Sequence, residues 1–274
     1  MSERVSERRA EDRAHLWLPL LARLTELSPL ASVRGNIESG LAGTGDIDLV
    51  APADDWDRIE ASFAGWAEEH GLGPVVACRH VFDGLILIAV GRSGSVFFEL
   101  EVRGSRYFRG AKLFGAADLL PATEMDPRGF RALRAGAEGL LMLVLNGLGR
   151  VGRPWPRKLE AKGVPETLRA DPAGVREGAR LFGWAEPAVL RGAAAVVEGG
   201  WDRRAMLSVE AWALLRAARD PRVLVRRARF RARGQRCLVA RTITDQGRSI
   251  AGDQKEWLRA VAEGHRVHGA GGDA

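Results

Sequence analysis

The chain has 274 residues, of which 46% are hydrophobic and 28% charged, which is typical of a globular protein with a substantial core. Lys and Arg outnumber Asp and Glu by 41 to 35, and the pI of about 10.1 favours an acidic partner such as a nucleotide, a nucleic acid or an anionic lipid surface. Cys78 and Cys237 lack the spacing of a disulfide framework or a structural zinc site. Because no signal peptide and no apolar run of membrane-spanning length is found, we expect a cytoplasmic protein without a membrane span.

The first third of the chain begins with a polar stretch, residues 1–13, that we expect to be frayed or disordered. An apolar stripe at helical spacing follows in residues 15–27, with Pro19 at the place where the helix is expected to begin or kink. Residues 30–33 have the pattern of a short strand. Residues 36–45 contain three glycines and are predicted to be a flexible loop that brings a second strand back beside the first.

That second strand, residues 47–50, carries the first chemical signal. Alternation places the carboxylates of Asp46 and Asp48 on one face, with Ile47 and Leu49 on the other. Two neighbouring carboxylates repel each other unless a cation lies between them, and a divalent metal ion is the obvious candidate. The pattern therefore predicts a metal site at this strand.

A glycine turn precedes the acid pair. Gly35 stands where the backbone must turn tightly after the first strand, flanked by Arg34 and Asn36. A glycine in such a turn lets main-chain N–H groups approach a phosphate. Together with Asp46 and Asp48, this turn predicts a metal-bridged polyphosphate site.

A later strand adds two further acids. Residues 52–73 have the pattern of a helix with an apolar face, and a turn at residues 91–94 leads to a return strand at residues 95–102. Alternation places Glu99 and Glu101 on the same face of that strand. Their shared face makes these two glutamates the second feature of interest, and a solvated strand face is the alternative interpretation.

The arrangement resembles the nucleotidyltransferase superfamily, whose fold is shared by kanamycin nucleotidyltransferase and DNA polymerase beta. The signature of that superfamily is a Gly-Ser or similar pair after a first strand, then Asp-hydrophobic-Asp-hydrophobic on a second strand. Gly35 takes the first place here, Asn36 stands where Ser is usual, and Asp46 and Asp48 take the second place. The resemblance covers about residues 28–120 and implies an α+β fold, with a mixed β-sheet and flanking helices.

The resemblance also implies a two-ion Mg²⁺ site. Asp46 and Asp48 would bridge the two ions. Glu101, or failing it Glu99, would complete the site, orient the acceptor hydroxyl and help remove its proton. Glu101 is favoured because members of the superfamily often follow this acid with Arg-Gly, matched here by Arg109-Gly110.

The implied activity follows from the same resemblance. Gly35 and Asn36 would bind the β- and γ-phosphates of a nucleoside triphosphate such as ATP, with Arg34 balancing the charge. The enzyme would transfer a nucleoside monophosphate to a hydroxyl group of a small-molecule acceptor and release pyrophosphate. Neither the acceptor nor the nucleobase is specified by the sequence.

After residue 121 few strand signals remain, and helical patterns dominate. Pro121 and Pro127 bracket a polar turn, where we place a domain boundary. The predicted organisation is described by four consecutive parts of the chain. They are a frayed N-terminus (1–13), a nucleotidyltransferase-like domain (14–122), an all-helical domain (123–268) and a Gly-rich tail (269–274).

An arginine-rich segment between Arg222 and Arg241 contains no acid, and its part up to Gly234 is predicted to be helical, although alternation from Arg227 to Arg233 also permits a strand. Such a segment is either an exposed basic face or a nucleic-acid contact with salt-sensitive binding. The second interpretation gives an alternative function: an inactive nucleotidyltransferase-like protein that binds nucleic acid or a protein partner. A third interpretation is a helical scaffold in which the acid pair is an accident.

Overall fold

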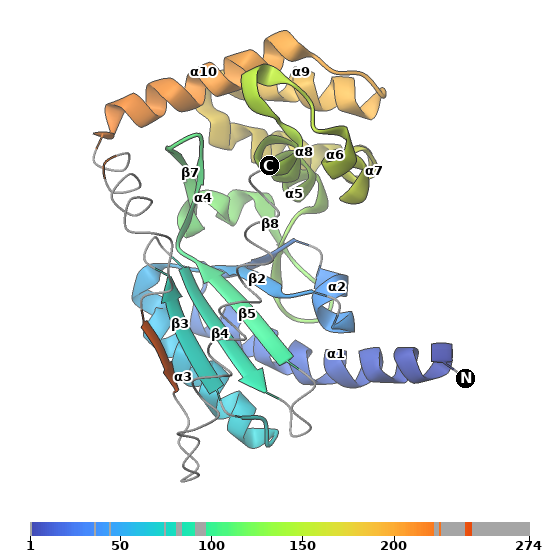
Figure 1. Cartoon of the computed structure of the whole chain (residues 1–274), viewed down its shortest axis with the longest axis vertical. Helices are drawn as coiled ribbons and strands as arrows, with labels where there is room; N and C mark the ends of the chain where they lie inside the picture. The colour runs from blue at the N-terminus through green and yellow to red at the C-terminus, as the bar shows by residue number, and fades with distance from the viewer. Residues whose placement is uncertain are drawn as a thin grey trace.

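The computed structural model describes residues 2–35, 37–43, 45–73, 75–80, 84–90, 97–221, 225 and 239–242. Within these residues the fold is α+β, with an eight-stranded mixed sheet, a two-stranded hairpin and a group of helices packed above the sheet (Figure 1). The helices are α1 (Ser2–Leu27), α2 (Ile37–Ala42), α3 (Trp56–Glu69), α4 (Ala116–Leu119), α5 (Ala135–Met142), α6 (Pro156–Ala161), α7 (Val164–Ala170), α8 (Pro172–Ala179), α9 (Glu186–Val197) and α10 (Arg203–Arg219). The strands are β1 (Ser32–Arg34), β2 (Ile47–Val50), β3 (Val75–His80), β4 (Gly84–Val90), β5 (Phe97–Arg103), β6 (Ser105–Phe108), β7 (Ala111–Gly115), β8 (Thr123–Met125), β9 (Arg131–Leu133) and β10 (Val239–Thr242). None of the described helices combines the length and the apolar content that crossing a bilayer requires.

The large sheet has the strand order β10-β3-β4-β5-β2-β1-β9-β8. β2 pairs with β1 antiparallel and with β5 parallel, so strands from three separate parts of the sequence meet at its centre. The register sets Arg34 opposite Asp48, and Asp48 opposite Glu101. Because opposite residues of neighbouring strands point to the same face, these three charged side chains form a row across the sheet.

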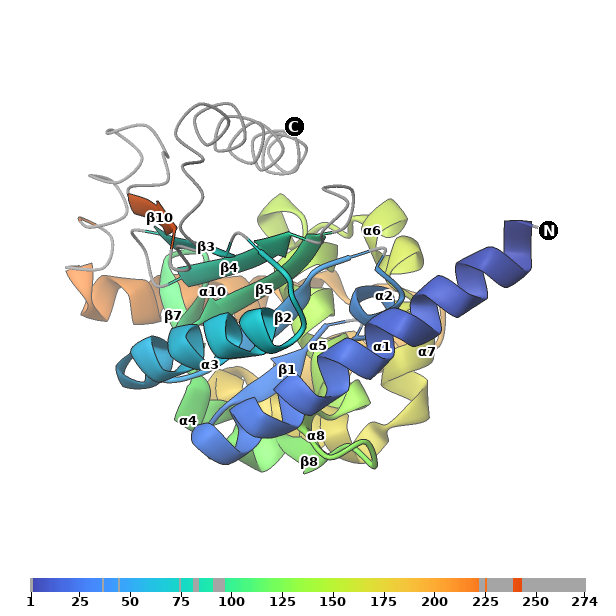
Figure 2. The same ribbon diagram turned by 90° about the horizontal axis from the view of Figure 1, so that it is seen from below.

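The other face of the sheet packs against α1 and α3, which lie side by side across it (Figure 2). Trp17 of α1 stacks on Trp66 of α3 with ring centroids 5.4 Å apart, and Trp66 contacts Phe98 of β5 edge-on. Alternation along the strands supplies the apolar residues of this core, including Ile47, Leu49, Leu85, Leu87, Leu100 and Val102. Burial of this face fixes the register, and the register places the charged row on the opposite face.

The helices after residue 134 pack closely through small residues. A Cβ atom on Gly136 of α5 would lie 1.9 Å from the carbonyl oxygen of Asp171, so only glycine allows α5 to approach the start of α8 this closely. Asp171 caps α8 by accepting a hydrogen bond from the N–H of Gly174, and it also pairs with Arg134 at 2.7 Å. Although burial raises the pKa of Asp171, the hydrogen bonds from Arg134 and the backbone lower it to about 2.

Two expectations for the first third of the chain need correction. α1 begins at Ser2, although residues 1–13 were expected to be frayed, and it passes through Pro19 without ending there. Burial of Trp17 on one side of this proline and of Leu20 on the other offsets the hydrogen bond that the proline removes. The second correction concerns residues 36–45, predicted as a loop, which contain the short helix α2.

The part of the chain after residue 122 is not all-helical. β8 and β9 fall within residues 123–133 and extend the sheet beside β1, while β10 pairs with β3 at the opposite edge. β8 and β9 have three residues each, too few for alternation to be visible in the sequence. β10 lies at the end of the arginine-rich segment, beyond Gly234, where the predicted helix ends. Apart from residues 225 and 239–242, residues 222–274 lie outside the described residues, and so do most of that segment and the predicted Gly-rich tail.

The contact between α2 and β2 gives a test of this fold. A Cβ atom on Gly40 would lie 2.6 Å from Cγ1 of Ile47 and 2.9 Å from the carbonyl oxygen of Asp46, whereas one on Gly65 of α3 would meet nothing within 4 Å. We predict that Gly40→Ala lowers the free energy of unfolding by about 1–3 kcal/mol through overpacking. Gly65→Ala should raise it by about 0.5–1 kcal/mol, because alanine favours the helix. Urea unfolding followed by circular dichroism measures both, and equal effects would contradict the packing of α2 on β2.

Candidate metal centre

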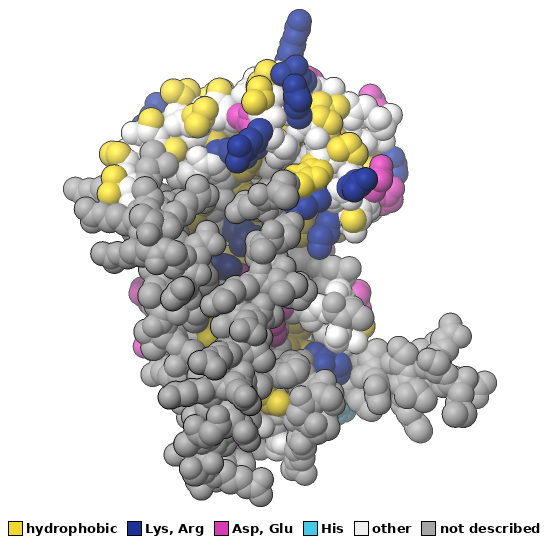
Figure 3. All heavy atoms as spheres, viewed as in Figure 1, with side chains coloured by type: hydrophobic (Ala, Val, Ile, Leu, Met, Phe, Trp, Pro, Cys, Tyr) yellow, Lys and Arg dark blue, Asp and Glu magenta, His cyan; other side chains and the backbone are white. Residues whose placement is uncertain are grey.

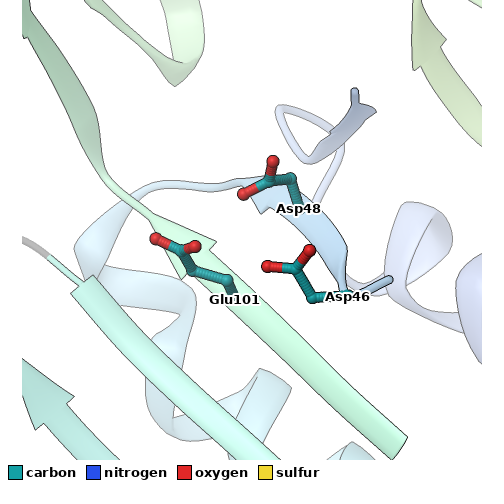
Figure 4. A group of neighbouring side chains, drawn as sticks. All are labelled: Asp46, Asp48 and Glu101. Atoms are coloured by element: carbon teal, nitrogen blue, oxygen red, sulfur yellow. The ribbon is translucent and has the colours of Figure 1, made fainter. Parts of the chain in front are cut away.

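Three carboxylates meet on the charged face of the sheet. Asp46 directly precedes β2, Asp48 lies within β2, and Glu101 lies on the parallel neighbour β5 (Figure 4). One carboxylate oxygen from each lies within 4.8 Å of the others. Among the described residues, no other group of three or more His, Cys, Asp or Glu side chains has ligand atoms this close together. The structure thus brings together the two aspartates and one of the two glutamates that the sequence singled out.

The donor set fits a hard divalent cation. All three groups offer carboxylate oxygens, which Mg²⁺ and Mn²⁺ prefer to nitrogen or sulfur ligands. Asp46 is exposed, while Asp48 and Glu101 are partly buried, so the site opens to solvent on the side of Asp46. A cation held by these three groups would keep coordination positions for water or for phosphate oxygens.

Glu99, the alternative third ligand, lies on the same face of β5 as Glu101 but two residues earlier in the strand. In the ladder it pairs with Ile88 of β4, while Glu101 pairs with Ile86 and Asp48. Glu99 does not belong to the converging group. The geometry therefore favours Glu101, as the Arg-Gly pattern did.

Arg34 lies buried beside the acids. Its side chain is only 4% exposed, and its Nη2 donates to Oδ2 of Asp48 at 3.2 Å. Its Nη1 lies 3.9 Å from Oε1 of Glu138 on α5. The sequence indicated that Arg34 balances charge at a phosphate, whereas the charges that it meets in this structure are those of two carboxylates.

Asp48 is held in an unfavourable environment for a carboxylate. Burial raises the pKa of Asp48, Arg34 lowers it, and the neighbouring Glu101 raises it again, so that the net shift is upward. Ionised Asp48 is thus incompletely compensated by the protein. A divalent cation at the three carboxylates would supply the missing compensation, which is a second reason why the donor set fits a metal.

Gly35 confirms the expected tight turn. Its φ is +82°, a conformation that residues with a side chain rarely adopt, and a Cβ atom there would lie 3.3 Å from Oδ2 of Asp48. Glycine is therefore required both by the turn and by the approach of the backbone to the acid. Asn36 lies outside the described residues.

Glu138 is a site residue that the sequence analysis missed. It is partly buried at the start of α5, with both carboxylate oxygens shielded from solvent, and Arg34, at 3.9 Å, is too distant for a hydrogen bond. Burial raises the pKa of Glu138 more than Arg34 lowers it. The available signal was a single acid within the apolar run of residues 135–145, which forms α5 and the turn after it.

Two further arginines near the acids were also missed. Arg103, two residues after Glu101 on β5, pairs with the carboxylate of Glu101. Arg106 lies on β6, and its electrostatic neighbours are Arg34, Arg103, Glu101 and Asp48. In the face shown in Figure 3, Lys and Arg side chains lie where the helices meet the sheet.

The Arg109-Gly110 pair, expected from the resemblance, forms the turn between β6 and β7. Both residues have positive φ, +47° and +96°, which is the geometry of a two-residue hairpin turn of type I′. The Arg109 side chain donates to the carbonyl oxygen of Gly149 at 2.6 Å and pairs with Glu210 at 3.0 Å. It thereby anchors the hairpin to the helices.

No protein-family model matches this chain, and no curated protein matches it. Among solved structures, the crystal structure of JHP933 from Helicobacter pylori matches with a TM-score of 0.32 and 12% sequence identity, over 81% of this chain and 97% of that chain. A likeness at this level carries no argument about fold or function. The chemistry of the site therefore rests on its own residues.

The environment of Glu138 gives a pH-dependent prediction. Its pKa is raised above the ordinary value of 4.5, so the folded protein binds more protons than the unfolded chain, and stability falls as pH rises through 4.5 towards the folded pKa. Glu138→Gln has no carboxyl group to titrate at this position, so it should not lose stability in this way as the pH rises. The variant should be more stable than the wild type at about pH 8, and the advantage should vanish below pH 4.5.

Thermal unfolding across this pH range measures the difference. The matched control is Glu198→Gln, which changes an exposed glutamate after α9 and should show no such pH dependence. A Glu138→Gln variant that is less stable than the wild type at high pH would show instead that the ion pair with Arg34 outweighs the cost of burial.

Proposed function

We propose that the protein is a metal-dependent nucleotidyltransferase of the superfamily that its sequence resembles. The observation that carries the proposal is the convergence of Asp46, Asp48 and Glu101 on one face of the sheet. Supporting it, the glycine turn of the motif approaches Asp48 directly, with Gly35 in a conformation that glycine favours. The reaction moves a nucleoside monophosphate from a nucleoside triphosphate to a hydroxyl group of a small-molecule acceptor and releases pyrophosphate.

The roles of the residues follow from their positions. Asp46 and Asp48 hold the metal, and Glu101 completes the ligand set and stands ready to accept the proton of the attacking hydroxyl. Bound Mg²⁺ would neutralise the polyphosphate and favour loss of that proton. Arg34 favours the ionised form of Asp48 in its partly buried position, because it pairs with the carboxylate that the metal needs.

The proposed mechanism asks little covalent chemistry of the protein. Transfer at phosphorus depends mainly on positioning the attacking and leaving oxygens in line and on stabilising charge. The sheet suits this task, because β2 and β5 are central strands whose register fixes the acids relative to one another. The helices beyond residue 134 lie next to the upper ends of the central strands in the view of Figure 1, and an acceptor bound beside them would approach the acids from that end.

Neutralising either aspartate should abolish the activity and leave the fold intact. We predict that Asp46→Asn or Asp48→Asn reduces Mg²⁺-dependent pyrophosphate release from a nucleoside triphosphate by about 100-fold or more, since metal-based charge stabilisation is worth several kcal/mol. The control is Asp54→Asn, which alters an exposed acid outside the site. Circular dichroism monitors folding. Full activity in the Asp46→Asn variant would contradict the proposal.

The two glutamates of β5 should behave differently. Glu101→Gln is expected to weaken Mn²⁺ binding and to lower turnover strongly, because it removes a ligand, whereas Glu99→Gln should leave both within about threefold. Calorimetric titration of Mn²⁺ measures the first property, and pyrophosphate release measures the second. The reverse order of effects would assign the third ligand to Glu99.

A further inference from the structure

Three guanidinium groups surround the carboxylates, and they differ in what they contact. Arg34 pairs with Asp48, and Arg103 pairs with Glu101. Arg106 forms neither a hydrogen bond nor an ion pair with any described residue, although it is partly buried. Arg34 and Arg103 are therefore each paired with an acid of the protein, and Arg106 has no such ion pair among the described residues.

The position of Arg106 is unfavourable in the protein alone. Burial lowers the pKa of Arg106, and the positive charges of Arg34 and Arg103 lower it further, while Glu101 and Asp48 raise it less. The guanidinium of Arg106 is thus held near other positive charges and makes no hydrogen bond or ion pair with a described residue. An anion that accepts its hydrogen bonds would offset this unfavourable environment.

The backbone directs Arg106 to this place. It lies on β6, and the ladder with β7 shifts register between Arg106 and Tyr107. A β-bulge of this kind changes the direction of neighbouring side chains and is frequent beside functional sites. The hairpin is itself held firmly, because Phe108 and Phe114 pack into the core of the helices and Arg109 anchors the turn. The backbone at Arg106 is thus held by a hairpin that packs on the helices.

The kind of ligand that would bind Arg106 follows from its positive charge and its shape. A guanidinium recognises oxyanions, and phosphate groups accept two parallel hydrogen bonds from it. Phosphate oxygens that coordinate a metal at Asp48 and Glu101 would lie beside two acids that interact electrostatically with Arg106, the guanidinium in the described part of the site that is not already paired. We infer, on the basis of the function proposed above, that Arg106 binds the pyrophosphate portion of the metal-bound nucleoside triphosphate and stabilises it as the leaving group.

The inference separates the roles of two arginines. Arg34 is buried and committed to Asp48, so it serves the metal ligand. Arg106 serves the substrate anion, a role that the sequence alone gave no reason to assign to it. A residue that acts on a ligand at a cost to the protein should show opposite effects on affinity and stability when it is removed.

The experiment uses the full chain and inorganic pyrophosphate with Mg²⁺ as the probe. Calorimetric titration compares the wild type with Arg106→Met, Arg106→Lys and the exposed control Arg204→Met. Arg106→Met should weaken binding by about 10- to 100-fold, Arg106→Lys should weaken it less, and Arg204→Met should leave it unchanged. Without ligand, Arg106→Met should melt at the same temperature as the wild type or higher, because the repulsion from Arg34 and Arg103 is removed.

Other outcomes are equally informative. Unchanged affinity in Arg106→Met, or a marked loss of its stability without ligand, would overturn the inference and make Arg106 a structural residue. If Asp46→Asn abolishes nucleotide consumption while Arg106→Met retains pyrophosphate affinity, the proposed function stands and the inference falls. If pyrophosphate binds through Arg106 with or without Mg²⁺ and no nucleotide is consumed, the anion site stands and the proposed function falls.

Discussion

A row of charged side chains across three central strands is the feature on which the candidate site depends. Arg34, Asp48 and Glu101 lie side by side on β1, β2 and β5, on the face opposite the aromatic core. A partly buried carboxylate is costly unless a cation is near, and Arg34 and Arg103 each pair with one of the acids, Asp48 and Glu101. Even with Arg34 beside it, the pKa of Asp48 is raised, so its ionised form is incompletely compensated at the place where the three carboxylates converge.

The same row connects the large sheet with the helices that follow residue 134. Arg34 lies between Asp48 of the sheet and Glu138 of α5, so the helices contribute an acid to the environment of a candidate metal ligand. The β6–β7 hairpin makes the complementary connection, since it begins at the sheet and packs into the core of the helices (Figure 1). Any change in the packing of helices on sheet would therefore alter the charges at the site.

The sequence was informative where the local pattern was long or chemically distinctive. β2 was predicted at residues 47–50 as observed, alternation placed Asp46 and Asp48 on one face, and the resemblance implied that an acid of the return strand joins them. The three-residue strands β8 and β9 gave no periodic signal. The roles of Glu138 and Arg106 depend on neighbours distant in sequence, which local patterns do not specify.

The most direct test of the central claim is anomalous diffraction from crystals grown with Mn²⁺ and a non-hydrolysable nucleoside triphosphate. Mn²⁺ is chosen because it accepts the same oxygen ligands as Mg²⁺ and scatters anomalously. The account predicts an anomalous peak bounded by carboxylate oxygens of Asp46, Asp48 and Glu101, with the phosphates on its open side. A well-ordered structure in which these acids contact only Arg34 and Arg103, with Mn²⁺ absent or bound elsewhere, would contradict it.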